Sequence, residues 1–147
     1  MKYVYDWPKA SVTADAVVFR KNNKNEWEVL LIKRKNEPFA GMWALPGGFM
    51  DMNETTLETA KRELEEETGL KDVDLKQLYT FDTIGRDPRG RTVSVTYYGT
   101  TDMNHSVVKG GDDAAEARWF NVKDLPELAF DHREPIRMAL ERIENPC

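Results

Sequence analysis

Apolar and β-branched residues along the first two thirds of the chain form a pattern typical of paired strands. Residues 11–20 (SVTADAVVFR) and 27–34 (WEVLLIKR) are rich in aliphatic side chains and flank the polar stretch KNNKNE. This arrangement predicts a β-hairpin with a solvated turn. Residues 76–85 and 91–101 repeat it around the turn sequence RDPRG, and residues 117–121 (ARWFN) favour a further short strand.

A helix is predicted over residues 55–68. Leu57, Ala60 and Leu64 recur there at spacings of three and four, which places them on one apolar stripe. Gly69 follows directly and is typical of a helix C-terminal cap. The stripe is therefore expected to pack in the core.

A second helix is predicted from Asp131 to about residue 145. Asp131 followed three residues later by Glu134 resembles a capping box. The apolar face of this helix carries Ile136, Leu140 and Ile143. Strands interleaved with two helices imply an α/β or α+β layered domain with a mixed sheet.

Composition favours one soluble domain spanning residues 1–147. The chain has 40% hydrophobic and 32% charged residues, enough for one core. No apolar run reaches the roughly 18 residues that a membrane span requires, and charged residues occupy the first ten positions, where a signal peptide would be apolar. The one cysteine is Cys147, so no intramolecular disulfide forms. We expect a cytoplasmic protein without a membrane partner.

The net charge of −5 argues against a nucleic-acid partner, because such binding depends on basic surfaces that contact phosphates. It does not exclude a small phosphorylated ligand. A metal ion bridges acidic side chains to an anionic substrate in many sites.

Three glutamates lie on one face of the first predicted helix. Glu63, Glu66 and Glu67 stand at positions i, i+3 and i+4. An acidic run of this kind is usually a solvated helix face. Here the carboxylates repel one another and lie near the helix C-terminus, where the helix dipole disfavours negative charge. A divalent cation removes both penalties, and oxygen ligands suit Mg²⁺ or Mn²⁺.

The segment from Gly47 to Leu70 resembles the signature of the Nudix hydrolase family. Every specified position of that signature is met, by Gly48, Glu54, Arg62, Glu63, Leu64, Glu66, Glu67, Gly69 and Leu70. The resemblance implies an α/β/α sandwich with a loop–helix–loop metal site. It also implies that Glu63, Glu66 and Glu67 bind catalytic metal ions and that the carbonyl of Gly47 adds a ligand.

The same resemblance assigns supporting roles and a reaction. Glu54 and Arg62 match positions that orient the glutamates through ion pairing, and Arg62 lies four residues before Glu66. The implied reaction is attack of a metal-bound water on a P–O–P linkage. A further carboxylate outside the signature often serves as ligand or base. The candidates for this role are Asp112, Asp113 and Glu116, with Glu66 as the alternative base.

The predicted substrate comes from segments outside the signature. Residues 86–91 (RDPRGR), 94–97, 11–15 (SVTAD) and 129–132 (AFDH) resemble the ADP-ribose pyrophosphatase branch. This likeness implies cleavage of ADP-ribose to AMP and ribose 5-phosphate. Guanidinium groups supply planar, multidentate contacts to phosphates. The candidate substrate ligands are Arg34, Arg86, Arg89 and Arg91.

Two other functions remain open from the sequence. The branch also resembles the ligand-sensing domain of bacterial repressors of NAD metabolism, in which a winged-helix segment follows the Nudix domain; the sequence ends soon after the second predicted helix. Alternatively, Trp43 and Phe39 precede the signature and would stack on the base of an oxidised nucleoside triphosphate, although packing on the sheet edge is the ordinary interpretation for them. His132 is expected to be a capping or packing residue. Many relatives in this branch are homodimers, which makes a homodimer an expectation here.

Overall fold

The computed structural model describes residues 2–111 and 114–146. Strands β1 (Ser11–Lys21) and β2 (Trp27–Arg34) pair antiparallel, which confirms the first predicted β-hairpin. Strands β5 (Lys76–Phe81) and β6 (Thr92–Thr100) also pair antiparallel. The fifth strand ends at Phe81, short of the predicted residue 85, and a turn-rich loop begins there.

A mixed sheet joins these pairs to three further strands. Strand β7 (Ala114–Asn121) lies against β2, and two strands that the pattern did not predict, β3 (Trp43–Ala44) and β4 (Gly47–Phe49), lie against β2 and β1. The order along the main path is β3-β2-β1-β6-β5. The β1–β6 pairing is parallel and the other pairings are antiparallel.

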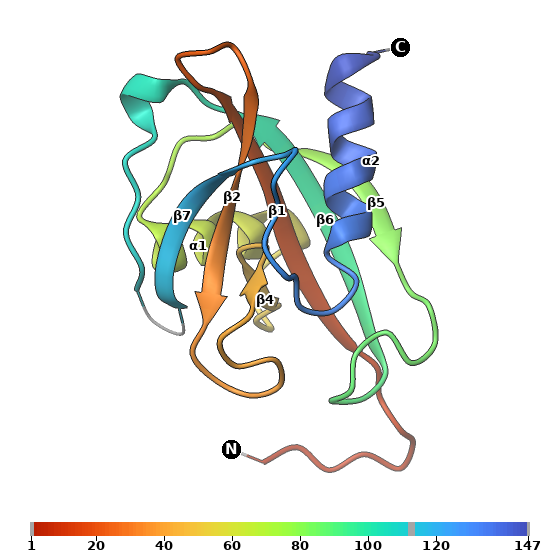
Figure 1. Cartoon of the computed structure of the whole chain (residues 1–147). Helices are drawn as coiled ribbons and strands as arrows, with labels where there is room; N and C mark the ends of the chain where they lie inside the picture. Colours follow the sequence, from red (N-terminus) through yellow and green to blue (C-terminus); the bar gives the residue numbers. More distant parts are fainter. Residues whose placement is uncertain (1, 112–113, 147) are drawn as a thin grey trace.

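Strand β1 lies in the middle of the sheet, and its side chains alternate between two cores. Ala14, Ala16 and Val18 belong to the cluster that includes Ala60 and Leu64 of helix α1 (Thr56–Thr68). The intervening residues Val17 and Phe19 belong to the cluster that includes Ile136 and Ala139 of helix α2 (Arg133–Glu144). Figure 1 shows α1 behind the sheet and α2 in front of it. The predicted α/β/α sandwich is thus confirmed.

The predicted capping box at the second helix is wrong. Helix α2 begins at Arg133, and its N-cap residue, His132, makes no capping hydrogen bond through its side chain. The Asp131 carboxylate instead accepts two hydrogen bonds from Arg86, and Glu134 pairs with Arg137. A buried guanidinium needs an anionic partner more strongly than a helix end needs a side-chain cap, so Arg86 pairs with the carboxylate.

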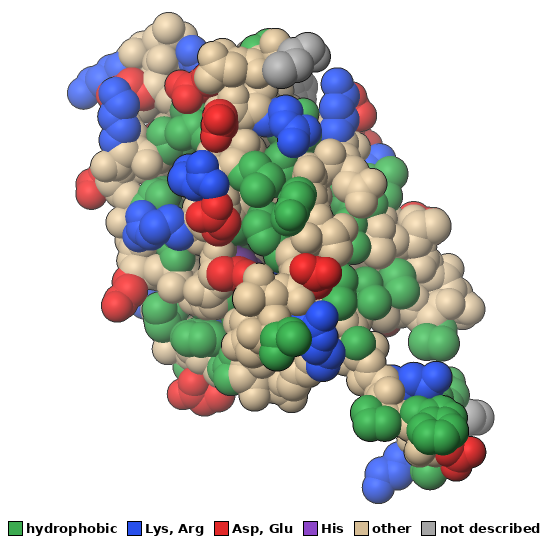
Figure 2. Space-filling view, turned by 90° about the vertical axis from the view of Figure 1, so that its right-hand side faces the viewer, with side chains coloured by type: hydrophobic (Ala, Val, Ile, Leu, Met, Phe, Trp, Pro, Cys, Tyr) green, Lys and Arg blue, Asp and Glu red, His purple; other side chains and the backbone are tan. Residues whose placement is uncertain are grey.

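The segment before β1 stands away from the body of the molecule. Figures 1 and 2 both show it projecting, and its large apolar side chains are exposed: Tyr3, Val4, Tyr5 and Trp7. Within the described residues, neither helix has the length and apolar character to cross a membrane.

Candidate active site

Helix α1 is fixed at both ends by local structure. The Thr55 side chain accepts a hydrogen bond from the Glu58 backbone while the Glu58 carboxylate accepts one from the Thr55 backbone, a capping box that the sequence analysis did not single out. Gly69 ends the helix in the left-handed region at φ 78°, as predicted. Ala60 and Leu64 are buried against the sheet. The caps and this apolar face hold the glutamates of α1 beside β4.

The guanidinium of Arg62 lies at the centre of a group of carboxylates. Its nitrogen atoms approach Glu54 and Glu63 at 2.7 Å and Glu66 at 3.2 Å, and Asp51 lies 3.6 Å away. The predicted pairing of Arg62 with Glu66 and with Glu54 is confirmed. Among the described residues that make these contacts, one positive charge therefore faces four negative ones.

The ionisation of Glu54 follows from these contacts. Hydrogen bonds from Arg62 and then from the Asp51 backbone lower the pKa of Glu54 from 4.5 to about 2. The Thr59 hydroxyl donates to the same carboxylate at 2.7 Å. The contact with Glu54 in turn raises the pKa of Arg62. At neutral pH both groups are charged, as an orienting ion pair requires.

Two glycines of β4 allow the backbone to approach the carboxylates closely. The Gly47 amide donates to Glu67 at 2.8 Å, and Glu67 is only 5% exposed. A Cβ atom at Gly48 would lie 2.7 Å from the Glu63 carboxylate, and one at Gly47 would lie 1.9 Å from Asp15 Oδ1. Neither position has room for a side chain, which explains the glycine pair.

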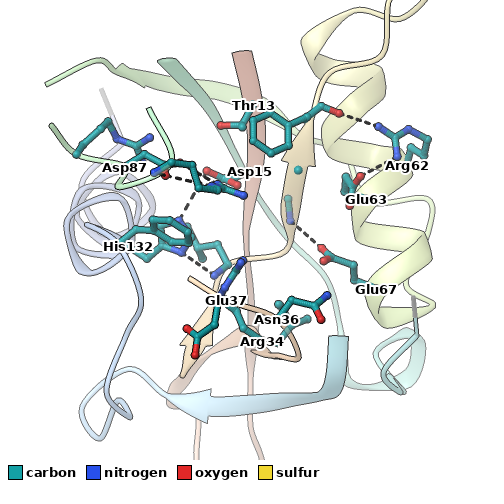
Figure 3. Close-up of a pocket in the computed structure, with 18 of the residues that line it drawn as sticks. Thr13, Asp15, Arg34, Asn36, Glu37, Arg62, Glu63, Glu67, Asp87 and His132 are labelled. Carbon is teal, nitrogen blue, oxygen red and sulfur yellow. Dashed lines mark hydrogen bonds and ion pairs between the residues drawn. The ribbon is translucent and has the colours of Figure 1, made fainter. Parts of the chain in front are cut away.

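A cavity of about 390 Å³ opens beside these glycines. Figure 3 shows Arg62, Glu63 and Glu67 on one side of it and Asp15, Asp87 and His132 on the other. We call this first side, together with Asp51, Glu54 and Glu66, which contact Arg62, the acidic wall. The opposite side, which we call the arginine wall, is formed by Arg34, Arg86, Asp87, Arg89, Phe130 and His132. Among the predicted site residues, Glu54 and Glu66 contact Arg62 from outside the cavity lining.

Each of two arginines on the arginine wall has its own carboxylate. Arg86, with a side chain only 6% exposed, donates to both oxygens of Asp131 at 3.0 and 2.8 Å. Arg89 donates to both oxygens of Asp87 at 3.1 and 2.8 Å. Burial alone raises the pKa of each carboxyl, but the arginine hydrogen bonds outweigh it and lower both values. The charges of Arg86 and Arg89 are thus each balanced by one carboxylate.

Two aromatic rings in the cavity were missed by the sequence analysis. The Arg89 guanidinium carbon lies 4.7 Å from the centre of the Phe49 ring and 5.2 Å from that of Phe130, and the same atom of Arg34 lies 5.1 Å from the Phe130 ring. Phe130 has a φ of 54°, which is unusual for a bulky residue. The available signal was the AFDH segment, which contains Phe130.

The aromatic residues considered for base stacking pack within the protein. The Trp43 ring lies 4.8 Å from the Phe120 ring in an edge-to-face contact, and Phe39 makes a similar contact with Phe130 at 4.7 Å. Trp43 also belongs to the short edge strand β3. Packing on the sheet edge, the ordinary interpretation, holds for Trp43.

Other candidates lie apart from the cavity or outside the described residues. Arg91 donates to the Asp82 carbonyl at 2.7 Å and does not belong to the cavity lining. Glu116 lies on β7, where it pairs with Arg118. Asp112 and Asp113 lie outside the described residues.

His132 and Asp15 form a buried polar pair on the arginine side of the cavity. His132 Nδ1 accepts a hydrogen bond from the Leu45 amide at 3.0 Å, and burial lowers the pKa of the imidazole. The Asp15 carboxylate accepts a hydrogen bond from the Ser94 hydroxyl at 2.6 Å. The prediction that His132 packs in the helix-cap region is confirmed. The sequence analysis did not predict Asp15 as a site residue. The available signal was the position of this carboxylate within the otherwise apolar strand β1.

The acidic wall has the donor chemistry of a site for a hard divalent cation. Carboxylates and the Gly47 carbonyl are oxygen donors of the kind that Mg²⁺ and Mn²⁺ accept. Within residues 2–111 and 114–146, no three acidic, histidine or cysteine side chains are arranged around one point as metal ligands. Arg62 and the Gly47 amide hold the glutamate oxygens instead.

Comparisons with known proteins place this geometry in a family. Residues 9–139 match the NUDIX domain. The chain is 43% identical over 127 residues to an ADP-ribose pyrophosphatase of Methanocaldococcus jannaschii, covering 86% of this chain and 71% of that protein. It is 31% identical over 144 residues to an ADPR-responsive transcriptional repressor of Acinetobacter baylyi, covering 95% of this chain but 57% of the repressor.

A solved structure agrees with these matches. The NUDIX domain of Shewanella oneidensis NrtR, complexed with ADP ribose, superimposes with a TM-score of 0.87 at 33% identity, covering 95% of this chain and 94% of that one. The mixed sheet, the glycine pair of β4 and the glutamates of α1 thus occur in a chain whose match extends over nearly all of its length. The chain belongs to the Nudix family.

Proposed function

We propose that this Nudix pyrophosphohydrolase cleaves ADP-ribose to AMP and ribose 5-phosphate with Mg²⁺ or Mn²⁺. The observation that carries the proposal is the pairing of two unlike walls across one cavity, an acidic wall in which four carboxylates face one guanidinium and an arginine wall with aromatic rings. The similarity to an ADP-ribose pyrophosphatase and to an ADP-ribose-bound Nudix domain supports the same substrate.

The cation would be held by the Gly47 carbonyl and the carboxylates of Glu63, Glu66 and Glu67. When bound, it supplies an activated water and neutralises charge on the phosphates. The excess of carboxylates over guanidinium groups around Arg62 supports this assignment, because a cation relieves their repulsion.

The protein's own groups orient the carboxylates and accept a proton. Arg62 holds Glu63 and Glu66 by their oxygens, and Glu54 fixes Arg62 from the other side. Glu66, the more exposed of these glutamates, is the general base that we favour over Glu116. Glu66 contacts Arg62, which lines the cavity, whereas Glu116 pairs with Arg118, which does not, and this difference supports the choice.

The arginine wall would bind the two phosphates and the nucleoside. Arg89 and Arg34 present guanidinium groups to the cavity, and Phe49 and Phe130 present apolar ring surface beside them. Arg86 acts through Asp131, because its side chain is only 6% exposed, whereas that of Arg89 is 36% exposed. Arg91 is not part of this proposal.

A sensor that binds ADP-ribose without cleaving it is the second candidate. The similarity to an ADPR-responsive repressor favours it. The complete signature, with all three glutamates present, favours the enzyme. Both candidates bind ADP-ribose, but only the enzyme cleaves it, so turnover distinguishes them.

A hydrolysis panel with Mg²⁺ tests the proposal. The substrates are ADP-ribose, NADH, dinucleoside polyphosphates and 8-oxo-dGTP, and the readout is chromatography of the products. We expect ADP-ribose to be cleaved fastest and to yield AMP. Binding of ADP-ribose without turnover would identify a sensor, and preference for 8-oxo-dGTP would identify the sanitising activity.

We further propose that residues 1–147 act as one Nudix domain and form a homodimer. The exposed apolar side chains of the projecting N-terminal segment support association, because such patches are usually covered. Light scattering of the purified chain tests this, and a monomer at micromolar concentration would contradict it.

A further inference from the structure

Asp15 and His132 are buried polar side chains of the cavity to which the proposed reaction gives no role. Asp15 is 8% exposed and His132 is 5% exposed, yet both belong to the cavity lining. They come from distant parts of the chain, the strand β1 and the start of α2. Figure 3 shows them on the same side of β4. Buried polar side chains usually make hydrogen bonds. Asp15 and His132 both line the cavity, so they can make hydrogen bonds with a bound ligand.

The hydrogen bond from Leu45 determines which nitrogen of His132 carries the proton. The Leu45 amide donates to Nδ1, so Nδ1 acts as an acceptor. Burial keeps the ring neutral, and the single ring proton is then on Nε2. Nε2 lies toward the Asp15 carboxylate. The cavity therefore has a neutral N–H donor at His132 opposite a carboxylate acceptor at Asp15.

The spacing of these two groups suits a third atom between them. His132 Nε2 and Asp15 Oδ2 lie 3.9 Å apart, too far for a direct hydrogen bond. An oxygen placed about 2.8 Å from each would accept from Nε2 and donate to the carboxylate. Ser94 holds the carboxylate through Oδ2 at 2.6 Å, and the ion pair of Arg86 with Asp131 holds the residue before His132. The donor and the acceptor are thus both fixed in place.

We propose that Asp15 and His132 together bind one hydroxyl group of a ribose in the substrate, and so determine specificity for sugar-linked diphosphates. A hydroxyl donates and accepts at the same oxygen, which matches the pair. A phosphate oxygen lacks a proton to donate and is repelled by Asp15, whereas a base N–H would leave the His132 donor without a partner. The inference rests on the proposed function, because it takes a ribose-containing diphosphate as the substrate.

Two substitutions at His132 separate its two hydrogen bonds. His132→Asn keeps an acceptor near the Nδ1 position for Leu45 and removes the Nε2 donor. His132→Gln places an amide donor near the Nε2 position and removes the acceptor for Leu45. We expect His132→Asn to raise KM for ADP-ribose about five- to tenfold with little change in kcat, and His132→Gln to stay near wild type in KM. A merely structural histidine gives the opposite order, with the Asn variant closer to wild type in both KM and Tm.

A double-variant cycle tests whether one hydroxyl bridges the pair. Asp15→Asn should also raise KM about five- to tenfold. Combined with His132→Asn, it should cost less than the sum of the two single effects, because the two hydrogen bonds share one oxygen and each is weaker without the other. Fully additive losses would overturn the shared hydroxyl.

Binding of the two products by calorimetry identifies which ribose is bound. The probes are AMP, 2′,3′-dideoxy-AMP and ribose 5-phosphate, titrated into wild type and His132→Asn. Weaker binding of ribose 5-phosphate alone assigns the terminal ribose. Weaker binding of AMP, with no effect on the dideoxy compound, assigns the nucleoside ribose. If none of the three binds more weakly to the variant, the inference is overturned.

These experiments separate failure of the inference from failure of the proposed function. A wild-type protein that cleaves ADP-ribose, with a His132→Asn variant of unchanged KM, contradicts the inference alone. A wild-type protein that binds a ribose phosphate through the pair but does not cleave ADP-ribose contradicts the proposed function alone. Absence of both binding and cleavage contradicts both.

Discussion

The two walls of the cavity differ in how their positive and negative side chains are paired. On the acidic wall, one guanidinium, that of Arg62, is shared among four carboxylates. On the arginine wall, Arg86 and Arg89 each have a carboxylate of their own. The first arrangement sets several negative charges against one positive charge, and the second gives each of these two arginines one carboxylate.

This difference indicates how each wall would act on a ligand. Unbalanced carboxylates attract a cation by charge, so the acidic wall is suited to chemistry that a metal ion supports. Paired arginines have little net charge to offer, so the arginine wall selects by hydrogen-bond geometry and ring contact. Changes on the first wall should affect turnover, and changes on the second should affect substrate affinity.

The largest expected effect comes from removing a carboxylate of the acidic wall. Glu67→Gln or Glu66→Gln should lower kcat for ADP-ribose by more than about 100-fold, because an amide is a weaker metal ligand and no base. The glutamine at position 67 still accepts from the Gly47 amide, so Tm should change little. Glu65→Gln, an exposed neighbour on α1, is the matched control. Full activity of either variant, or of wild type in excess chelator, would show that the acidic wall does not support turnover through a metal ion.

Loss of an arginine on the opposite wall should raise KM instead. Arg86→Ala and Arg89→Ala should each cost about 1 to 3 kcal/mol in kcat/KM, mainly through KM, with unchanged metal affinity. Arg86→Ala should also lower Tm, because it leaves the Asp131 carboxylate without its partner. Arg91→Ala, outside the cavity lining, is the control and should behave as wild type. If Arg86→Ala and Arg89→Ala both keep wild-type steady-state kinetics, residues 86–91 form a turn that takes no part in substrate binding.

A pH titration of thermal stability tests the ion pair between Glu54 and Arg62. Its folded-state pKa of about 2 lies below the ordinary value of 4.5. The ionised group therefore stabilises the fold fully above about pH 4.5, and this contribution, roughly 1 to 2 kcal/mol, is lost as pH falls toward 2. Tm measured from pH 6 to pH 2 should fall less steeply for Glu54→Gln than for wild type. Parallel curves would show that the Arg62 contact is absent in solution.

The smallest expected effect is that of metal removal on stability. Helix α1 has its own caps and apolar face, so its packing does not depend on a cation. Chelation should lower Tm by no more than a few degrees, the size of a modest ligand-linkage contribution. Calorimetry with and without chelator measures this. A collapse of Tm would mean that the acidic wall is a structural site.

The acidic wall could be predicted because its residues are close in sequence. Helical spacing alone brings Arg62, Glu63 and Glu66 together, and Gly69 marks where the helix ends. The family signature extends over the same short segment. Local periodicity is therefore sufficient to locate this half of the site.

The arginine wall could be predicted only as a set of separate segments. Asp131 has the spacing of a helix cap, but a side chain 45 residues earlier, Arg86, takes its carboxylate. The pairing of Asp15 with Gly47 between β1 and β4 is likewise long-range, and β4 is too short to give a periodic signal. Such contacts form between residues that are far apart in the sequence, so a local sequence pattern does not predict them.

The central strand β1 also limits where the chain tolerates changes in length. Ala14 and Ala16 lie in the α1 core while Asp15 between them lines the cavity, so deletion of one residue between Asp15 and the turn, such as Val17, would move Asp15 and the residues before it to the opposite faces. The carboxylate would then be forced into hydrocarbon and the cavity would acquire an alanine. The exposed turn at residues 22–26 has no such constraint, and it is the natural place for an inserted tag or fused peptide.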